Sequence, residues 1–252
     1  MNTHDGKAAK ATDRAVTLTV SSDIARIAID DGRRNVMTTE LLAQIHGAIL
    51  QAEQEARVML LTGRRGIFSA GFDLQVFARR DPAEIQAMMR AGAELALRLF
   101  TYPRPVISAC NGHAFPMGAF LLLASDVRLG AEGDYLIGLN EVQLGIPVPQ
   151  FAVELCRSRM TPAWFHRIPQ GELLGPAKAA EAGFLDRVVD EVDLETAAME
   201  VAVSLSKLHQ QAFQTTKLRV RGQAAARMRE AIDAEITIEH FRLMVEREGA
   251  TP

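Results

Sequence analysis

The stretch that decides the fold is GRRGIFSAGFDL, which occupies residues 63–74. It follows the apolar run Val58–Thr62, whose length and composition are typical of a buried strand. The small residues at positions 69–71 allow the backbone to approach a ligand closely before a helix begins. A strand that ends in this way can present backbone N–H groups to an anionic oxygen. Taken alone, the pattern is more typical of an ordinary strand-to-helix turn, and no Gly-Lys-Ser/Thr follows that would indicate a P-loop.

A second stretch, PVISACNGHAFPMGAF at residues 105–120, repeats this arrangement. The buried strand Val106–Cys110 runs into the turn Asn111-Gly112 and then into an apolar helix at 117–125. Pro116 suits the first helical position, where a missing N–H breaks no helix hydrogen bond. The free N–H groups of the first turn, together with the helix dipole, predict a second electropositive point.

A third stretch, YLIGLNEVQLGI at residues 135–146, contains Glu141 as the lone carboxylate of a largely apolar segment. When this stretch is considered alone, an exposed loop glutamate or one held in a buried ion pair is the simpler explanation. If the apolar residues surround Glu141 in the fold, desolvation raises the pKa of its carboxyl group and makes it a stronger base.

Taken in order and at these separations, the three stretches resemble the crotonase superfamily, also called the enoyl-CoA hydratase/isomerase family. The family patterns FSAGxDL, PVI-A-NG and E-x-x-LG match residues 68–74, 105–112 and 141–145. Shorter matches support them, namely RNVM at 34–37, SDVR at 125–128 and AAEAGFLD at 179–186. The resemblance covers about residues 17–189 and is looser in the C-terminal helices.

The resemblance implies an α/β fold, a crotonase-like spiral core of ββα units followed by a C-terminal helical trimerisation region. It divides the chain into a disordered N-terminus at residues 1–14, an α/β core at 15–190 and a helical region at 191–252. A homotrimer, or two trimers paired into a hexamer, is the expected assembly.

Hydrophobic periodicity predicts a similar order of elements. Strands at 58–62 and 106–110, separated by a helix at 83–100, predict parallel pairing with crossover helices. A strand pair is expected at 15–20 and 24–29, followed by a helix that begins near Thr38 or Thr39. Further helical patterns occupy 151–160, 162–168, 176–182, 194–208 and 223–248.

Members of the family stabilise a thioester enolate with two backbone N–H groups, and the resemblance assigns these donors to Phe72 and Met117. The family usually has glycine at the second position, so the Met117 side chain must either point away from the thioester or narrow the pocket. Family hydratases use two glutamates, whose positions fall on Phe120 and Glu141. Because phenylalanine cannot accept a proton, the pattern is similar to that of the Δ3,Δ2-enoyl-CoA isomerases, which use one glutamate. The predicted catalytic residues are Glu141, Phe72 and Met117.

The resemblance also implies that a CoA thioester is the substrate and that neither a cofactor nor a metal takes part. The residues expected to contact the substrate are Arg34, Val36, Ala70, Asp73, Leu74 and Phe120. Neighbouring arginines, Arg33, Arg64 and Arg65, are either phosphate ligands or solvated side chains.

Other polar residues receive simpler interpretations. Lys217, Arg219 and Arg221 are expected to form a solvated helix face rather than a second contact with CoA. His113 matches no catalytic-triad or metal spacing, so a packing or capping role is expected for it.

Two other functions stay open at this point. Glu141 alone could support hydration of a 2-enoyl-CoA, with the water held by backbone groups. The unusual residues Met117 and Phe120 could instead belong to a non-catalytic acyl-CoA-binding protein on the same scaffold.

Composition limits the remaining possibilities. A chain of 252 residues can bury a sizeable core, and its formal net charge of −3 gives no reason to expect a nucleic-acid partner. The two cysteines lack metal or disulfide spacing. The sequence shows neither a signal-peptide pattern nor an apolar run long enough to span a bilayer. A cytoplasmic protein without a membrane partner is therefore expected.

Overall fold

The computed structural model describes residues 15–249, so the predicted disordered N-terminus at 1–14 lies outside the described residues. Its largest sheet has the strand order β1-β2-β4-β7-β9-β12. The first pair is an antiparallel hairpin, and the other neighbours are parallel. The strands are β1 Val16–Ser21, β2 Ile24–Ile29, β4 Val58–Thr62, β7 Val106–Cys110, β9 Val127–Ala131 and β12 Arg187–Val189.

A second sheet has the order β11-β10-β8-β5, and two short strands, β3 and β6, form a parallel pair beside it. The chain passes from the large sheet to this layer three times, in the steps β4 to β5, β7 to β8 and β9 to β10. This repeated step is the spiral of ββα units predicted from the sequence. The strands are β3 Val36–Met37, β5 Gly66–Ser69, β6 Gly71–Phe72, β8 Gly112–Ala114, β10 Ile137–Gly138 and β11 Leu173–Leu174.

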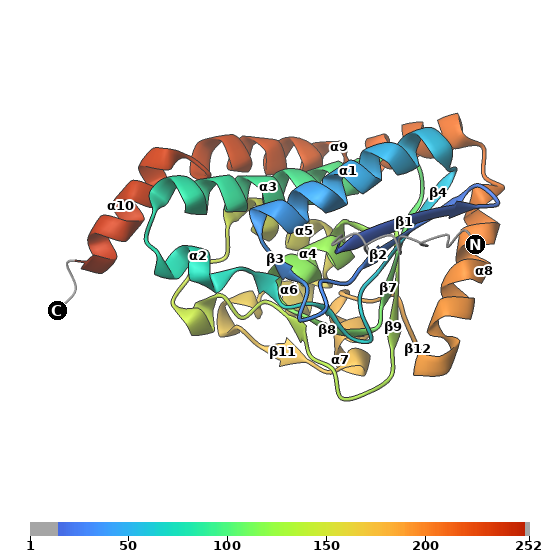
Figure 1. Cartoon of the computed structure of the whole chain (residues 1–252), viewed down its shortest axis with the longest axis horizontal. Helices are drawn as coiled ribbons and strands as arrows, with labels where there is room; N and C mark the ends of the chain where they lie inside the picture. The colour runs from blue at the N-terminus through green and yellow to red at the C-terminus, as the bar shows by residue number, and fades with distance from the viewer. Residues whose placement is uncertain (1–14, 250–252) are drawn as a thin grey trace, which may run out of the picture.

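Helices cover both faces of the large sheet (Figure 1). One face packs into the main core together with α1, α3 and the fully buried α4. The opposite face packs against α8, whose Leu194, Ala198 and Ala202 contact apolar strand residues such as Ile107. Hence α8, which falls in the predicted C-terminal helical region, packs directly on the α/β core. The helices concerned are α1 Thr39–Glu55, α3 Pro82–Phe100, α4 Pro116–Ala124 and α8 Leu194–Ser206.

The C-terminal helices differ from the single helix predicted at 223–248. The chain forms α9 over Gln210–Glu235, which packs along α3 and α5, and then α10 over Ile238–Gly249, which packs on α3 (Figure 1). The early start of α9 was missed because its first half buries two charged side chains, Lys217 and Arg221, and so lacks an apolar period. The break falls at Ile236 and Thr237, where the Thr237 hydroxyl accepts from the His240 N–H at 3.2 Å.

The remaining elements are short and connect these layers. The helices are α2 Leu74–Ala78, α5 Gln150–Arg159, α6 Pro162–Phe165 and α7 Pro176–Ala182, and three 3-10 turns occupy Val142–Leu144, Ile168–Gln170 and Glu191–Asp193. No helix within residues 15–249 has the length and apolar character needed to cross a membrane.

Candidate active site

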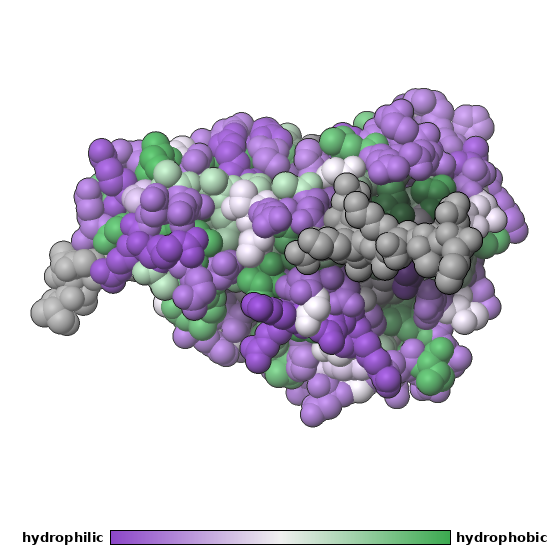
Figure 2. Space-filling model, in the orientation of Figure 1, coloured by the Kyte–Doolittle hydropathy of each residue, from purple (hydrophilic) through white to green (hydrophobic). Residues whose placement is uncertain are grey.

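A cleft of about 750 Å³ opens where β3, β6, α2 and α3 meet β8 and the segment that follows β10. All three sequence stretches contribute to its wall. The residues that line it are Arg34, Val36, Ile67, Ala70, Gly71, Phe72, Asp73, Leu74, Gln75, Phe77, Met89, His113, Phe115, Pro116, Asn140, Glu141, Leu144, Ile146 and Pro149. Figure 2 shows hydrophobic residues gathered on the surface below α2. Val142 and Leu144, in the turn that follows Glu141, have exposed side chains.

Glu141 is the buried carboxylate of this cleft. Its side chain is 7% exposed, and neither carboxylate oxygen has a hydrogen-bond partner among the described residues. Its backbone is fixed by the following turn, because the Glu141 carbonyl accepts from the Leu144 and Ile146 N–H groups at 2.9 Å each. Burial raises the pKa of Glu141 to about 7. A carboxylate with this pKa can both remove and return a proton near neutral pH.

The two predicted N–H donors come from neighbouring elements. Phe72 ends β6, and Met117 is the second residue of α4. The elements approach closely at Gly71, where an added Cβ would lie 3.4 Å from Cδ of Pro116 and the backbone has a φ of +86°. The Met117 N–H precedes the first internal bond of α4, which the Ala119 N–H donates to the Phe115 carbonyl at 3.1 Å. It is therefore one of the first-turn N–H groups that an α-helix leaves without an internal acceptor.

The Met117 side chain is directed away from the cleft. It is fully buried, and its Sδ lies against Gly92 of α3, 3.1 Å from where a Cβ on that glycine would be. The Phe72 ring lies against the same glycine, 2.5 Å from that Cβ position. Because Gly92 has no side chain, those of Phe72 and Met117 can both pack against α3. Gly92 of α3 therefore makes room for the Met117 side chain to point away from the cleft.

Phe120 does not line the cleft, in contrast to the substrate contact predicted for it. The side chain is fully buried, and its ring packs edge-on against Phe151 of α5 with centroids 5.6 Å apart. It belongs to the core cluster between α4 and α5 and is absent from the residues that line the cleft.

The other five residues predicted to contact substrate, Arg34, Val36, Ala70, Asp73 and Leu74, all line the cleft. The Ala70 N–H donates to the Arg34 carbonyl at 3.0 Å, which ties the first motif to the loop before β3. Asp73 caps α2 by accepting from the Gln75 N–H at 2.9 Å. The structure brings these residues to one wall, and their contact with a substrate stays a prediction.

The neighbouring arginines are divided. Arg33 lies with Arg34 along a groove that continues from the cleft. Arg64 lies 3.8 Å from a carboxylate oxygen of Asp30. Arg65 lies outside the cleft and pairs with Glu191 at 2.8 Å. Of these four arginines, Arg33 and Arg34 are therefore the two available to a ligand of the cleft.

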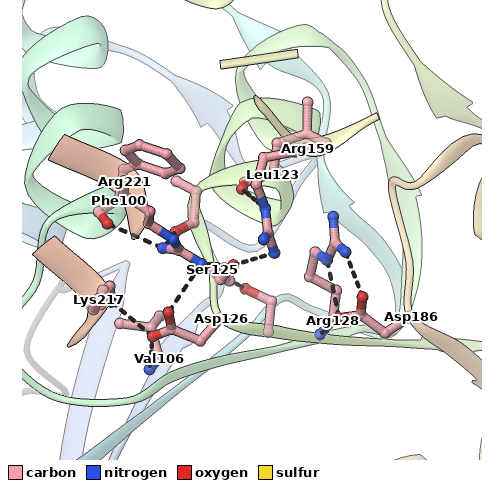
Figure 3. A network of polar contacts seen from close by, with 12 residues as sticks. Phe100, Val106, Leu123, Ser125, Asp126, Arg128, Arg159, Asp186, Lys217 and Arg221 are labelled. Carbon is pink, nitrogen blue, oxygen red and sulfur yellow. Dashed lines mark hydrogen bonds and ion pairs between the residues drawn. The ribbon is translucent and has the colours of Figure 1, made fainter. Parts of the chain in front are cut away.

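Lys217 and Arg221 are not solvated, which corrects the helix face predicted for them. Both are buried and reach Asp126, at 2.7 and 2.9 Å respectively (Figure 3). Arg221 also donates to the carbonyls of Phe100 and Ala124, which end α3 and α4. Burial lowers the pKa of Lys217 to about 8 despite its carboxylate partner. These side chains join α9 to the far end of the helix that carries Met117.

Two polar residues of the cleft had received no functional role from the sequence. Asn140 precedes Glu141 and has a buried Oδ1 without a hydrogen-bond partner among the described residues. His113, for which packing or capping was expected, lies on the wall beside Phe115. The sequence offered one signal for His113. Residues two apart in a strand point to the same side, so His113 and Phe115 are expected to share a face.

Comparison with known proteins agrees with this geometry. Residues 19–249 match the family model for enoyl-CoA hydratase/isomerase. The chain is 31% identical over 207 residues to human mitochondrial enoyl-CoA delta isomerase 1, covering 80% of this chain and 68% of the relative. An enoyl-CoA hydratase/isomerase family protein from Pseudomonas syringae superposes with a TM-score of 0.86 at 35% identity, covering 88% and 96% of the two chains. A probable enoyl-CoA hydratase from Mycobacterium tuberculosis gives 0.88 at 33% identity, covering 94% and 100%.

The fold and the site thus define an enzyme of the crotonase superfamily. The chain belongs to the enoyl-CoA hydratase/isomerase family, as the three sequence motifs predicted. The predicted fold class is confirmed as well, with a helical C-terminal region after the spiral core.

Proposed function

We propose that the protein moves the double bond of a 3-enoyl-CoA to position 2, with Glu141 as the single base. The Glu141 carboxylate removes a proton from C2, and the electrons of that bond pass into a dienolate whose charge lies on the thioester oxygen. The N–H groups of Phe72 and Met117 hold this oxygen. The electrons then return to form the C2–C3 double bond, and Glu141 delivers its proton to C4.

The observation that carries the proposal is the state of Glu141. It is the carboxylate of the cleft that is buried and unpaired, and its pKa is raised to about 7 by burial. Asp73, the other carboxylate of the wall, is engaged at the start of α2. The first glutamate position of the hydratases holds Phe120, which is buried in the core. One base that serves two carbons accounts for this arrangement.

Hydration of a 2-enoyl-CoA is the second candidate, and one observation favours it. Three buried acceptor oxygens, two from Glu141 and one from Asn140, lie in the cleft wall without donors among the described residues. A water molecule could donate to two of them, because a buried water typically satisfies such orphaned groups. Asn140 would then do part of what the missing glutamate does in hydratases. Relatives of this chain carry both names, isomerase and hydratase.

The absorbance of the conjugated 2-enoyl thioester separates the candidates. Isomerisation of 3-enoyl-CoA makes this absorbance appear, whereas hydration of 2-enoyl-CoA removes it. Glu141→Gln is expected to abolish the appearance of the conjugated product, and Glu132→Gln, the same change on an exposed loop, should leave it intact. Retained isomerisation by Glu141→Gln would refute the assignment. Binding of enoyl-CoA without turnover of either substrate would favour a non-catalytic binding protein.

The remaining expectations follow from family membership. We propose an acyl-CoA thioester as the substrate and a homotrimer, alone or paired into a hexamer, as the assembly. Sedimentation of the purified protein tests the assembly. The cytoplasmic location and the lack of a cofactor, a metal, a nucleic-acid partner or a membrane partner stay predictions.

A further inference from the structure

His113 is a polar residue of the cleft wall that the isomerisation does not require. It lies on β8 in register with Ile67 of β5, and both side chains line the cleft. Four residues further along the chain, Met117 provides the N–H assigned to the thioester oxygen. The side chain therefore lies beside the path of the bound thioester, a short distance in sequence from the reacting group.

The His113 ring is held in one orientation. Its Nδ1 accepts a hydrogen bond from the Leu136 N–H at 3.0 Å, and the Leu136 carbonyl accepts from the Ala114 N–H at the same distance. Phe115 stacks on the ring with centroids 5.6 Å apart, and Tyr135 meets it edge-on at 6.0 Å. A ring fixed on three sides loses little conformational entropy when a ligand binds.

The same contacts fix the tautomer. A nitrogen that accepts a hydrogen bond carries no proton, so the neutral ring carries its proton on Nε2. Nε2 has no acceptor within residues 15–249. His113 therefore offers the cleft a preoriented neutral N–H donor that nothing in the described protein uses.

The position of this donor indicates which part of a thioester it meets. Its register partner Ile67 lines the cleft together with Arg34, and the Ile67 carbonyl accepts from the side chain of Asn35, the residue after Arg34, at 3.4 Å. A guanidinium at that end suits the phosphates of CoA. In the other direction, the chain leads to Met117 at the thioester. Between phosphates and thioester lies the pantetheine arm, whose polar groups facing a wall are amides.

We propose that His113 is a substrate-binding residue whose Nε2–H donates a hydrogen bond to an amide carbonyl of the pantetheine arm. The proposal rests on the acyl-CoA substrate proposed above. It gives His113 a role in holding the arm of the thioester and none in proton transfer, which separates it from Glu141.

Two substitutions test the roles of Nδ1 and Nε2 of His113 separately. His113→Asn can keep an acceptor near the Leu136 N–H but removes the donor at the Nε2 position. His113→Gln can place an amide N–H where Nε2 lies. Thermal unfolding of both variants checks that the fold is retained. Butanoyl-CoA, a saturated thioester that cannot isomerise, measures binding without turnover, and butanoyl-pantetheine and S-ethyl butanethioate provide ligands with and without the amides.

For His113→Asn we expect the Kd of butanoyl-CoA and of butanoyl-pantetheine to rise about threefold to tenfold, as for the loss of one neutral hydrogen bond. The Kd of S-ethyl butanethioate should be unchanged, and His113→Gln should stay within about twofold of the parent protein. An unchanged Kd for butanoyl-pantetheine in His113→Asn overturns the proposal, and so does an effect confined to butanoyl-CoA, which would indicate a phosphate contact. Failure of the parent protein to bind butanoyl-CoA would instead overturn the proposed substrate.

Discussion

The proton-transfer role proposed for Glu141 predicts a specific pH dependence. In the free enzyme, burial raises the pKa of this carboxyl to about 7 from its ordinary value of 4.5. The base is active only when it is ionised, so kcat/KM for isomerisation should rise with pH and level off above neutrality. The profile of kcat/KM reports the free enzyme, which is the state that the structure describes.

The size of the effect follows from the two values. With a pKa of about 7, the ionised fraction of Glu141 is roughly 9% at pH 6 and roughly 91% at pH 8. We therefore expect kcat/KM to increase about tenfold between these pH values. A carboxyl with the ordinary pKa of 4.5 would already be roughly 97% ionised at pH 6, and the pH profile of kcat/KM would be flat. The two possibilities differ by a factor that ordinary initial-rate measurements resolve.

The assay follows the conjugated product from pH 5.5 to 9 at constant ionic strength. A 3-enoyl-pantetheine thioester serves as a second substrate, because it lacks the phosphates of CoA that can themselves titrate. Glu132→Gln is the matched control, since it neutralises an exposed carboxylate that does not line the cleft. A flat profile in the parent protein refutes the desolvated base. A rising profile that persists in Glu141→Gln refutes Glu141 as its source.

Three further changes test the parts around this base. Glu141→Gln should raise the free energy of unfolding by about 3 kcal/mol above pH 7 and leave it unchanged below pH 4.5. The raised pKa of Glu141 in the folded state means that its ionised form destabilises the fold at the higher pH, and glutamine removes this cost. Urea unfolding above pH 7 and below pH 4.5 measures the difference. Met117→Pro removes one N–H donor in the first helical turn and should lower kcat about 10²–10³-fold, whereas Met117→Leu retains the N–H and most of the activity. Gly92→Ala places a Cβ 2.5 Å from the Phe72 ring, so it should lower the free energy of unfolding by about 1–3 kcal/mol and reduce kcat; unchanged stability would contradict the packing.

Much of the fold was predictable because local signals and the long-range order agree. Alternating strands and helices predicted parallel pairing with crossover helices, and the three motifs, through their resemblance to the crotonase superfamily, predicted the spiral core. The start of α9 was not predictable from periodicity, because its buried face carries Lys217 and Arg221 instead of apolar residues. Such positions are stabilised by partners distant in sequence, here Asp126 and the ends of two helices, and no local pattern reports them.

The candidate site, like the fold, was predictable from the sequence only in part. The motifs predicted that Glu141 and the backbone of Phe72 would border one cleft, and both residues lie in its wall. They could not predict how Met117 is accommodated, since the space comes from Gly92, on a different helix. Nor did they predict the burial of Phe120 against Phe151. Side-chain direction in these cases is decided by packing between helices, which a single sequence does not display.

The helix α4 shows how stability and function are distributed along one element. Its N-cap residue is Phe115, which has no side-chain acceptor for the first-turn N–H groups, and Pro116 has no N–H. A serine or aspartate at the cap would add about 1 kcal/mol of stability, but its oxygen would compete with the thioester for the Met117 N–H. The opposite end is instead heavily satisfied, because Arg159 and Arg221 donate to its last carbonyls (Figure 3). Cations there also favour the helix dipole. The helix is thus anchored at its C-terminal end by buried side chains, while its N-terminus has no side-chain cap that would compete for the N–H proposed to hold the thioester oxygen.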